Sequence, residues 1–176
     1  MILLICGSLR AGSVNAAVLG TAATFTKTTT YAGLADLPHF NPDDDRDPLH
    51  PAVADMRARI AAADALLFCT PEYAGGLPGS FKNLLDWTVG GGEIYGKPVA
   101  WINASSGAAP TGAGDAHDSL RKVLTYAGAR IVTEACARIP VPRAVVADGL
   151  VTDPDLQGRI AMAVNDLREG AVPPAE

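Results

Sequence analysis

Residues 1–15 have the sequence MILLICGSLRAGSVN. An apolar run from Ile2 to Cys6 is followed by a loop rich in glycine and serine and then by a helical pattern that starts at Val14. The run is shorter than the ~18 apolar residues that a membrane helix needs, and it lacks the basic start and cleavage site of a secretory signal. The segment therefore predicts a buried first strand, a polar loop, and a helix with Ser13 as its N-cap.

The same alternation of short apolar runs and helical patterns continues along the chain. The expected strands are Ile2–Cys6, Thr28–Tyr31, Ala65–Cys69, Pro98–Asn103 and Ile131–Ala135. Helical patterns, with apolar residues three and four positions apart, are expected at Val14–Phe25, around Val53, Met56 and Ile60, at Phe81–Trp87, from Leu120 to Ala127, and from Leu156 to Leu167. Asp153-Pro154 provides an N-cap and first residue for the last of these helices. Strands that alternate with helices favour a parallel sheet with right-handed crossovers. We therefore predict one doubly wound, three-layer α/β domain over residues 1–176.

Composition and charge exclude several classes of protein. Of the 176 residues, 48% are hydrophobic and 19% are charged, which is not the composition of a disordered chain. A net charge of −5 argues against a nucleic-acid partner. The cysteines, Cys6, Cys69 and Cys136, lie in or beside apolar runs without zinc-site spacing, so we expect structural thiols and no metal site. We expect no membrane partner and a cytoplasmic location.

The loop between the first strand and the first helix is a candidate phosphate site. In doubly wound sheets, ligands bind beyond the carboxyl ends of the strands, where strand order reverses. Ser8, Arg10 and Ser13 can donate to an anion beside the start of a helix. The loop has neither a GxGxxG nor a Walker A pattern, so one phosphomonoester suits it better than a pyrophosphate. The alternative is that Ser13 only caps the helix and Arg10 is a solvated charge.

Two further loops follow the third and fourth expected strands. Residues 70–87 have the sequence TPEYAGGLPGSFKNLLDW, and their glycine-rich part would let backbone N–H groups approach a flat ligand. The alternative here is a rigid turn that starts a helix. The loop after the fourth strand begins Ala104-Ser105-Ser106-Gly107.

Together, the first two loops resemble the NADPH-dependent FMN reductase family, which includes flavin, quinone, azo-dye and chromate reductases. Residues 7–15 are similar to its GSLRxxSxN phosphate motif, and residues 71–87 to its PEYNxSxPGxxKNxxDW motif, in the same order. The resemblance implies a flavodoxin-like sandwich: a five-stranded parallel sheet of order 2-1-3-4-5 with helices on both faces. The chain departs from the pattern at Ala74 and Gly76, where the family often has Asn and Ser.

The resemblance also implies the residues that bind FMN. The residues assigned to the phosphate and its surroundings are Ser8, Arg10, Ser13, Val14 and Asn15. Those assigned to the flavin ring are Pro71, Glu72, Tyr73, Ala74 and Gly75. Those assigned to the pyrimidine side of the ring are Ser105, Ser106 and Gly107. Four more residues match the motif but are expected to serve structure and subunit contact: Lys82, Asn83, Asp86 and Trp87.

The implied activity is a ping-pong reaction. NADPH or NADH gives a hydride to flavin N5 and leaves, and an acceptor then takes two electrons at the same face. The acceptor is a quinone, an azo or nitro compound, a metal oxyanion or free flavin. Orientation and electrostatics do most of this work, so we expect no catalytic side chain and assign Glu72 to binding and loop geometry. The family pattern implies a homodimer or homotetramer.

Two other functions stay open: a flavodoxin-type electron carrier without nicotinamide activity, and a non-catalytic binding module of the same fold. The run Asp43-Asp44-Asp45 is expected to be a solvated loop. The segment Gly90-Gly91-Gly92 predicts either a mobile entry path for the nicotinamide or a plain loop.

Overall fold

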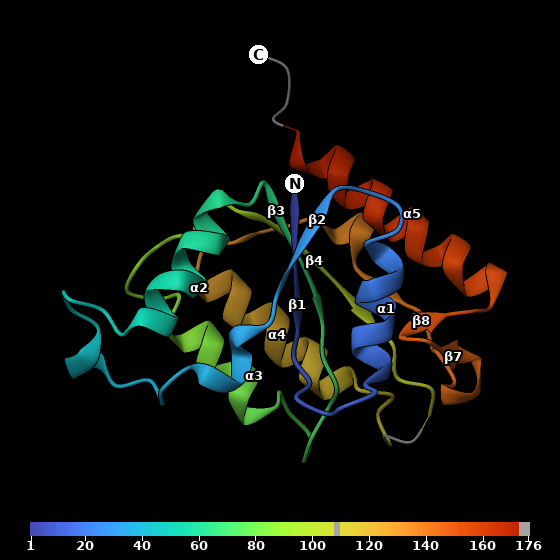
Figure 1. Ribbon diagram of the computed structural model, residues 1–176, viewed down its shortest axis with the longest axis horizontal. Coiled ribbons are helices and arrows are strands. Elements are labelled where there is room, and N and C mark those ends of the chain that lie inside the picture. Colours follow the sequence, from blue (N-terminus) through green and yellow to red (C-terminus); the bar gives the residue numbers. More distant parts are fainter. Residues whose placement is uncertain (108–109, 173–176) are drawn as a thin grey trace.

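A parallel sheet forms the centre of the computed structural model, which describes residues 1–107 and 110–172 (Figure 1). Its strand order is β2-β1-β3-β4-β5, with β6 also paired to β4. The strands are β1 (Ile2–Cys6), β2 (Thr28–Tyr31), β3 (Ala65–Cys69), β4 (Pro98–Asn103), β5 (Arg130–Ile131) and β6 (Ala137–Arg138). The predicted strand order is therefore confirmed.

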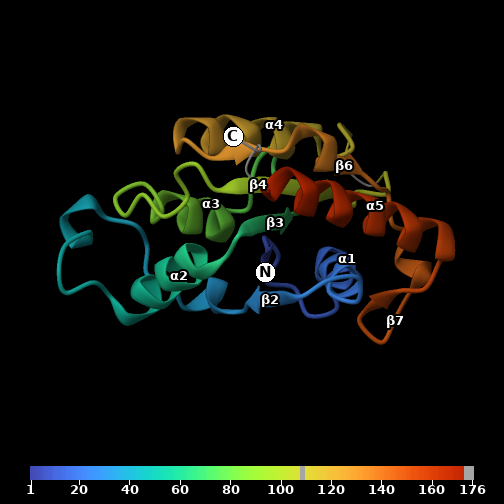
Figure 2. The ribbon, with the colours of Figure 1, turned by 90° about the horizontal axis from the view of Figure 1, so that it is seen from above.

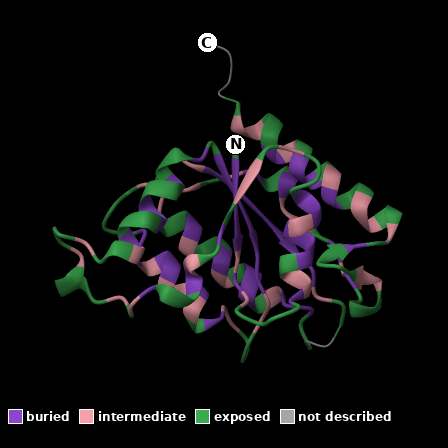
Figure 3. Ribbon diagram, in the orientation of Figure 1, coloured by how far each residue is buried: buried purple, intermediate pink, exposed green. Residues whose placement is uncertain are grey.

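Helices cover both faces of the sheet, as predicted (Figures 1 and 2). One face packs against α1 (Val14–Ala22) and α5 (Pro154–Ala171). The other packs against α2 (Pro51–Ala62), α3 (Gly79–Asp86) and α4 (Gly114–Tyr126). Buried residues follow the strands and the inward sides of the helices (Figure 3). Among the described residues, none of the helices combines the length and the apolar character needed to cross a membrane.

The fifth strand differs from the prediction of a strand over Ile131–Ala135. Only Arg130 and Ile131 form β5, a 3-10 turn follows over Thr133–Ala135, and β6 then pairs with Ile102 and Asn103. The reason is visible in the burial pattern, because Val132 and Ala135 are buried while the two residues between them are exposed. A spacing of three buries one side of a helical turn, whereas a strand alternates with a period of two. The strand prediction gave more weight to the β-branched residues Ile131, Val132 and Thr133 than to this spacing of the buried residues.

Three other features differ from the prediction or were missed. Helix α1 ends at Ala22, before the predicted Phe25, and the chain leaves it through short turns. A hairpin of β7 (Val146–Ala147) and β8 (Leu150–Val151) covers the outer side of α1, where Thr21 Oγ1 accepts a 2.9 Å hydrogen bond from the Val151 amide. Its turn is Asp148-Gly149 with both φ angles positive, a dipeptide that typically closes a two-residue hairpin. Further 3-10 turns cover Gly33–Asp36, Pro42–Asp44 and Arg143–Val145.

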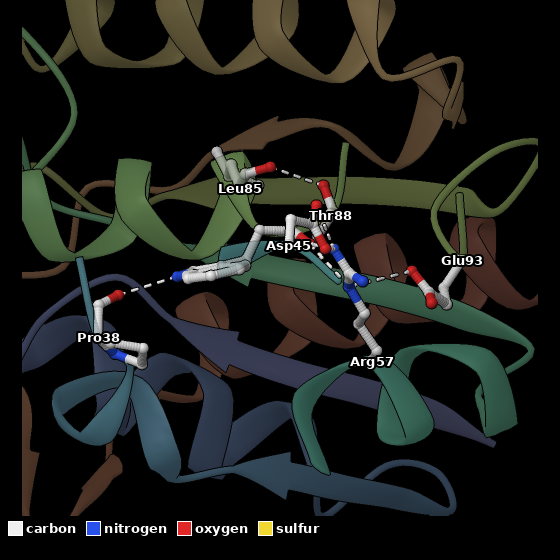
Figure 4. Close-up of polar contacts among 7 residues, drawn as sticks. Pro38, Asp45, Arg57, Leu85, Thr88 and Glu93 are labelled. Carbon is white, nitrogen blue, oxygen red and sulfur yellow. Dashed lines mark hydrogen bonds and ion pairs between the residues drawn. The ribbon is translucent and has the colours of Figure 1, made fainter. Parts of the chain in front are cut away.

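The loop after β2 is held by a buried arginine of α2 (Figure 4). The Arg57 guanidinium donates to the Trp87 carbonyl from Nε (2.9 Å) and from Nη2 (2.6 Å), and Nη2 lies 2.8 Å from Asp45 Oδ1. Glu93 Oε2 lies 3.8 Å from Nε. The expectation of a solvated aspartate run is therefore wrong for Asp45, whose side chain is only 11% exposed. Gly90 packs against the Asp45 carboxylate, where a Cβ would overlap it, and this contact favours the plain-loop alternative for residues 90–92.

Two residues of the second motif anchor the same loop from α3 and its C-terminal end. The Pro38 carbonyl accepts hydrogen bonds from Asn83 Nδ2 and Trp87 Nε1, both at 2.9 Å. The Phe40 amide donates to Asn83 Oδ1 at 2.7 Å, and the Phe40 ring meets Trp87 edge to face. These contacts give Asn83 and Trp87 a structural role within the chain.

Candidate functional site

The loops at the carboxyl ends of β1, β3 and β4 surround a cavity of about 570 Å³. Because β2 and β3 pair with opposite edges of β1, this is the point of the sheet where strand order reverses and where ligands bind in such folds. The predicted site residues that line it are Val14, Asn15, Pro71, Glu72, Ala74, Gly75, Ser105 and Ser106. Four residues outside the predicted site set complete the lining: Thr70, Ala104, Pro110 and Val141.

The other predicted site residues lie outside this lining. Arg10 and Ser13 line a neighbouring cavity of about 420 Å³ at the start of α1, and Val14 lines both cavities. Ser8 Oγ accepts a 3.3 Å hydrogen bond from the Arg10 amide. The exposed Tyr73 closes a tight turn through two backbone hydrogen bonds with Gly76, at 3.0 and 3.1 Å.

The exposed Gly107 has a φ of 107° and follows Ser106 at the end of the described part of this loop. Position 108, which the family resemblance also places in this Ser/Gly loop, and position 109 lie outside the described residues.

Glu72 ties the second loop to the start of α4. Thr111 Oγ1 donates to its two carboxylate oxygens at 3.0 and 3.2 Å, and the Ala116 amide donates to Oε2 at 3.0 Å. Helix α4 has no side-chain cap of its own, because Ala113 occupies the N-cap position. A carboxylate at a helix N-terminus satisfies an unpaired amide and interacts favourably with the helix dipole. Glu72 therefore sets the geometry of the cavity rim as a cap supplied by another loop.

Ala74 has a left-handed backbone with a φ of 51°, and Gly75 follows with a φ of 72°. Asparagine and glycine adopt this conformation more readily than other residues, which explains why the family pattern often has Asn at position 74. The nearest atom to a Cβ built on Gly75 would be Asp115 Oδ2 at 4.0 Å, so the turn leaves space beside its backbone.

The third loop is organised by Asn103, the last residue of β4. Its buried side chain donates from Nδ2 to the Gly112 carbonyl at 2.9 Å and accepts from the Ser105 amide at 3.0 Å. The Val141 amide donates to the Ala104 carbonyl at 3.1 Å and brings Val141 into the cavity wall. An asparagine at a strand end before Ser-Ser-Gly was a signal for this role that sequence reasoning missed.

A buried histidine supports the same region from α4. His117 Nδ1 lies 2.7 Å from the Ala113 carbonyl, and its Nε2 is buried without a partner among the described residues. Burial lowers the pKa of His117 below its usual value, which keeps the ring neutral near neutral pH.

The lining suits a flat heteroaromatic cofactor. Val14, Pro71, Ala74 and Val141 offer apolar surface, while Asn15 and the serine loop offer hydrogen-bonding groups. An apolar cavity with a few placed polar groups is the usual form of a cofactor site.

The model of the NADPH-dependent FMN reductase family matches residues 1–140. The chain belongs to this family. Membership confirms the predicted FMN cofactor and the predicted nicotinamide-dependent reductase activity.

Two known proteins with similar sequences are named as reductases. An NAD(P)H-dependent FMN reductase of Pseudomonas aeruginosa is 40% identical over 127 residues, which cover 69% of this chain and 68% of that protein. A 2-hydroxy-1,4-benzoquinone reductase of Burkholderia sp. is 38% identical over 71% of this chain and 70% of its own length.

Solved structures share the fold. The flavoenzyme NAD(P)H:(acceptor) oxidoreductase FerB of Paracoccus denitrificans superposes with a TM-score of 0.80 at 31% identity, covering 96% of this chain and 97% of that one. A flavodoxin of Pseudomonas aeruginosa shares the fold, with a TM-score of 0.58 at 17% identity over 95% of this chain and 98% of that one.

Proposed function

We propose that this protein is an NAD(P)H-dependent quinone reductase whose FMN lies in the cavity at the carboxyl ends of β1, β3 and β4. The observation that supports this site is that residues from both family motifs line one cavity. When bound, FMN accepts a hydride from the nicotinamide and passes two electrons to the acceptor.

The phosphate of FMN would be held where the two cavities meet. Val14 lines both of them, and Arg10, Ser13 and the amides at the start of α1 lie on the side of the smaller one. A helix N-terminus with a guanidinium and hydroxyls binds a phosphate dianion well. Ser8 belongs to the same group through its hydrogen bond with the Arg10 amide.

The flavin ring would lie in the larger cavity. The backbone from Pro71 to Gly75 would face the ring, with Glu72 fixing that backbone through its bonds to the α4 loop. The amides of Ser106 and Gly107 would donate to the pyrimidine side and stabilise negative charge there. The Ser105 amide already donates to Asn103, so Ser105 would contribute to this side of the ring through its hydroxyl.

We propose a quinone as acceptor in preference to azo compounds, nitro compounds, metal oxyanions or free flavin. The names of relatives support this, among them a Solanum tuberosum NAD(P)H:quinone oxidoreductase that is 28% identical over 89% of this chain and 84% of its own length. The turn at the cavity is also compatible, because Ala74 and Gly76 carry no polar side chain. An uncharged flat ring needs orientation and stacking rather than such polar contacts.

The remaining proposals concern the whole chain. Residues 1–176 would form a single domain, since the described strands β1 to β6 belong to one central sheet. The protein would be located in the cytoplasm. The chain would assemble as a homodimer or homotetramer. Exposed aromatic side chains support assembly: Tyr95 and Tyr126 are 77% and 90% exposed, and aromatic residues are enriched at protein interfaces.

The test begins with the absorbance spectrum of the purified protein under anaerobic conditions. We expect flavin bands that NADPH or NADH bleaches and that 1,4-benzoquinone restores. A bound flavin that ignores both nicotinamides would instead indicate the electron carrier, and failure to bind added FMN would indicate the binding module. Steady-state kcat/KM should be higher for benzoquinone than for an azo dye or chromate, and the reverse order would exclude the quinone proposal alone.

A further inference from the structure

Two thiols lie beneath the first loop, at the carboxyl ends of neighbouring strands. Cys6 ends β1, Cys69 ends β3, and the two residues are register partners in the parallel pair. Register partners in adjacent strands point to the same face of a sheet, and here both belong to the core face that is covered by α1. Cys69 is fully buried and Cys6 is half-buried.

Cys6 donates a hydrogen bond to the first loop, and Cys69 donates one to the first turn of α1. Cys69 Sγ donates to Asn15 Oδ1 at 3.2 Å, and Cys6 Sγ donates to the Ser8 carbonyl at 3.6 Å. Burial raises the pKa of both thiols, so both keep the proton that they donate. The bond between Cys69 and Asn15 joins residues that are 54 positions apart in the sequence, and it links the end of β3 to the cavity wall.

The hydrogen bond from Cys69 to Asn15 Oδ1 determines which atom of the Asn15 carboxamide is available to the cavity. A carboxamide has one acceptor oxygen and one nitrogen that donates twice. The thiol occupies the oxygen, while Nδ2 donates to no other group in the described part of the chain. Without the thiol, rotation of the carboxamide by half a turn would exchange the two groups.

We propose that Cys69 is a positioning residue for the cofactor: its buried thiol fixes the Asn15 carboxamide with the nitrogen toward the cavity, as a donor to the phosphate or ribityl oxygens of FMN. This inference rests on the proposed placement of FMN in that cavity. It gives a functional role to a thiol that the sequence indicated only as a core residue.

Substitution by serine and by alanine separates positioning from packing. Serine keeps a hydrogen-bond donor at nearly the same place, whereas alanine removes it. A hydroxyl in an apolar core is less favourable than a methyl group. Packing alone therefore predicts that Cys69→Ser harms the protein at least as much as Cys69→Ala, while positioning predicts that FMN affinity survives in Cys69→Ser and falls in Cys69→Ala.

The experiment measures the dissociation constant of FMN by quenching of flavin fluorescence on titration with apoprotein. The proteins are the natural chain, Cys69→Ala, Cys69→Ser, Asn15→Ala and the double variant of Asn15→Ala with Cys69→Ala. Cys136→Ala serves as the matched control, because that half-buried thiol donates to the Val132 carbonyl and does not line the cavity. Circular dichroism establishes that each variant is folded.

We expect Cys69→Ala to weaken FMN binding about three- to tenfold, the effect of one hydrogen bond. Cys69→Ser and Cys136→Ala should stay within about twofold of the natural chain, and the double variant should bind no more weakly than Asn15→Ala alone. Equal weakening in Cys69→Ser and Cys69→Ala, or multiplicative losses in the double variant, would overturn the proposal.

The outcomes also separate this inference from the proposed function. If the natural chain binds no FMN, the proposed site itself fails. If the natural chain binds FMN and Asn15→Ala binds it equally well, the site stands and the positioning role of Cys69 is wrong. Should Cys69→Ala not fold, a loss of FMN affinity in Cys69→Ser as large as that in Asn15→Ala would still overturn the proposal.

Discussion

The guanidinium of Arg57 allows a sharp test of how the loop after β2 is held. Replacing Arg57 with methionine keeps most of the apolar stem and removes the cation from beside Asp45, whose carboxylate would then be nearly buried and unpaired. The Trp87 carbonyl would also lose the two hydrogen bonds that Arg57 donates. Breaking a buried ion pair by removing one partner typically costs about 3–5 kcal/mol. Since a domain of this size has a free energy of unfolding of about 5–15 kcal/mol, we expect a large fraction of it to be lost.

The assay is urea unfolding followed by tryptophan fluorescence, with the loss read as a lower midpoint at unchanged slope. Arg59→Met is the matched control on the same helix. Arg59 donates to Asp55 at 2.7 Å, but both side chains are exposed, and such pairs contribute little to stability. We expect the control to leave the midpoint unchanged. A loss below about 1 kcal/mol for Arg57→Met, or equal losses in the two variants, would refute the reasoning.

Three further predictions follow from the site. Glu72→Ala removes the cap of α4 and should lower the free energy of unfolding by about 1 kcal/mol and speed hydrogen exchange of the Ala116 amide; unchanged protection of that amide would contradict it. Burial lowers the pKa of His117 in the folded state, so the unfolded chain takes up the proton first as the pH falls. The free energy of unfolding should therefore decrease as the pH drops below 6.5, the ordinary pKa of histidine, and should level off once the pH is below the folded-state pKa. His117→Gln should flatten that fall, and equal urea midpoint changes between pH 7 and pH 5.5 in both proteins would rule out this role. Ala74→Asn should raise the melting temperature by relieving left-handed strain, whereas Gly75→Ala should lower it, and calorimetry that gives the opposite order would show the strain argument to be wrong.

The parts of the fold that were predictable from sequence are those set by short-range pattern. The first four strands have the predicted bounds. The central strands β1, β3 and β4 are buried on both faces and their sequences are almost continuously apolar, whereas the edge strand β2 was predictable from its β-branched threonines. The two loop motifs were predictable for a similar reason, since their glycines, prolines and serines set local turn and cap geometry. The cavity lining confirms that residues of both motifs come together.

The parts that were not predictable depend on contacts between distant segments. Glu72 was assigned to binding and loop geometry, but its partners were not predictable, because Thr111 and Ala116 lie 39 and 44 positions further along the chain. Asp45 looked solvated because nothing near it in sequence indicates that Arg57 is on the buried side of α2. The prediction of a strand over Ile131–Ala135 was wrong because it relied on the local preference of β-branched residues for strands. In the folded chain, residues 133–135 form a 3-10 turn that packs against the distant helix α5.

The interrupted edge of the sheet has a consequence for behaviour at high concentration. An edge strand with a long row of unpaired N–H and C=O groups is a template for strand addition and aggregation. Here β5 and β6 offer two residues each, separated by a turn, and β2 on the opposite edge offers four. A foreign strand would find few consecutive groups to pair with at either edge, so the sheet is poorly suited to seed fibres.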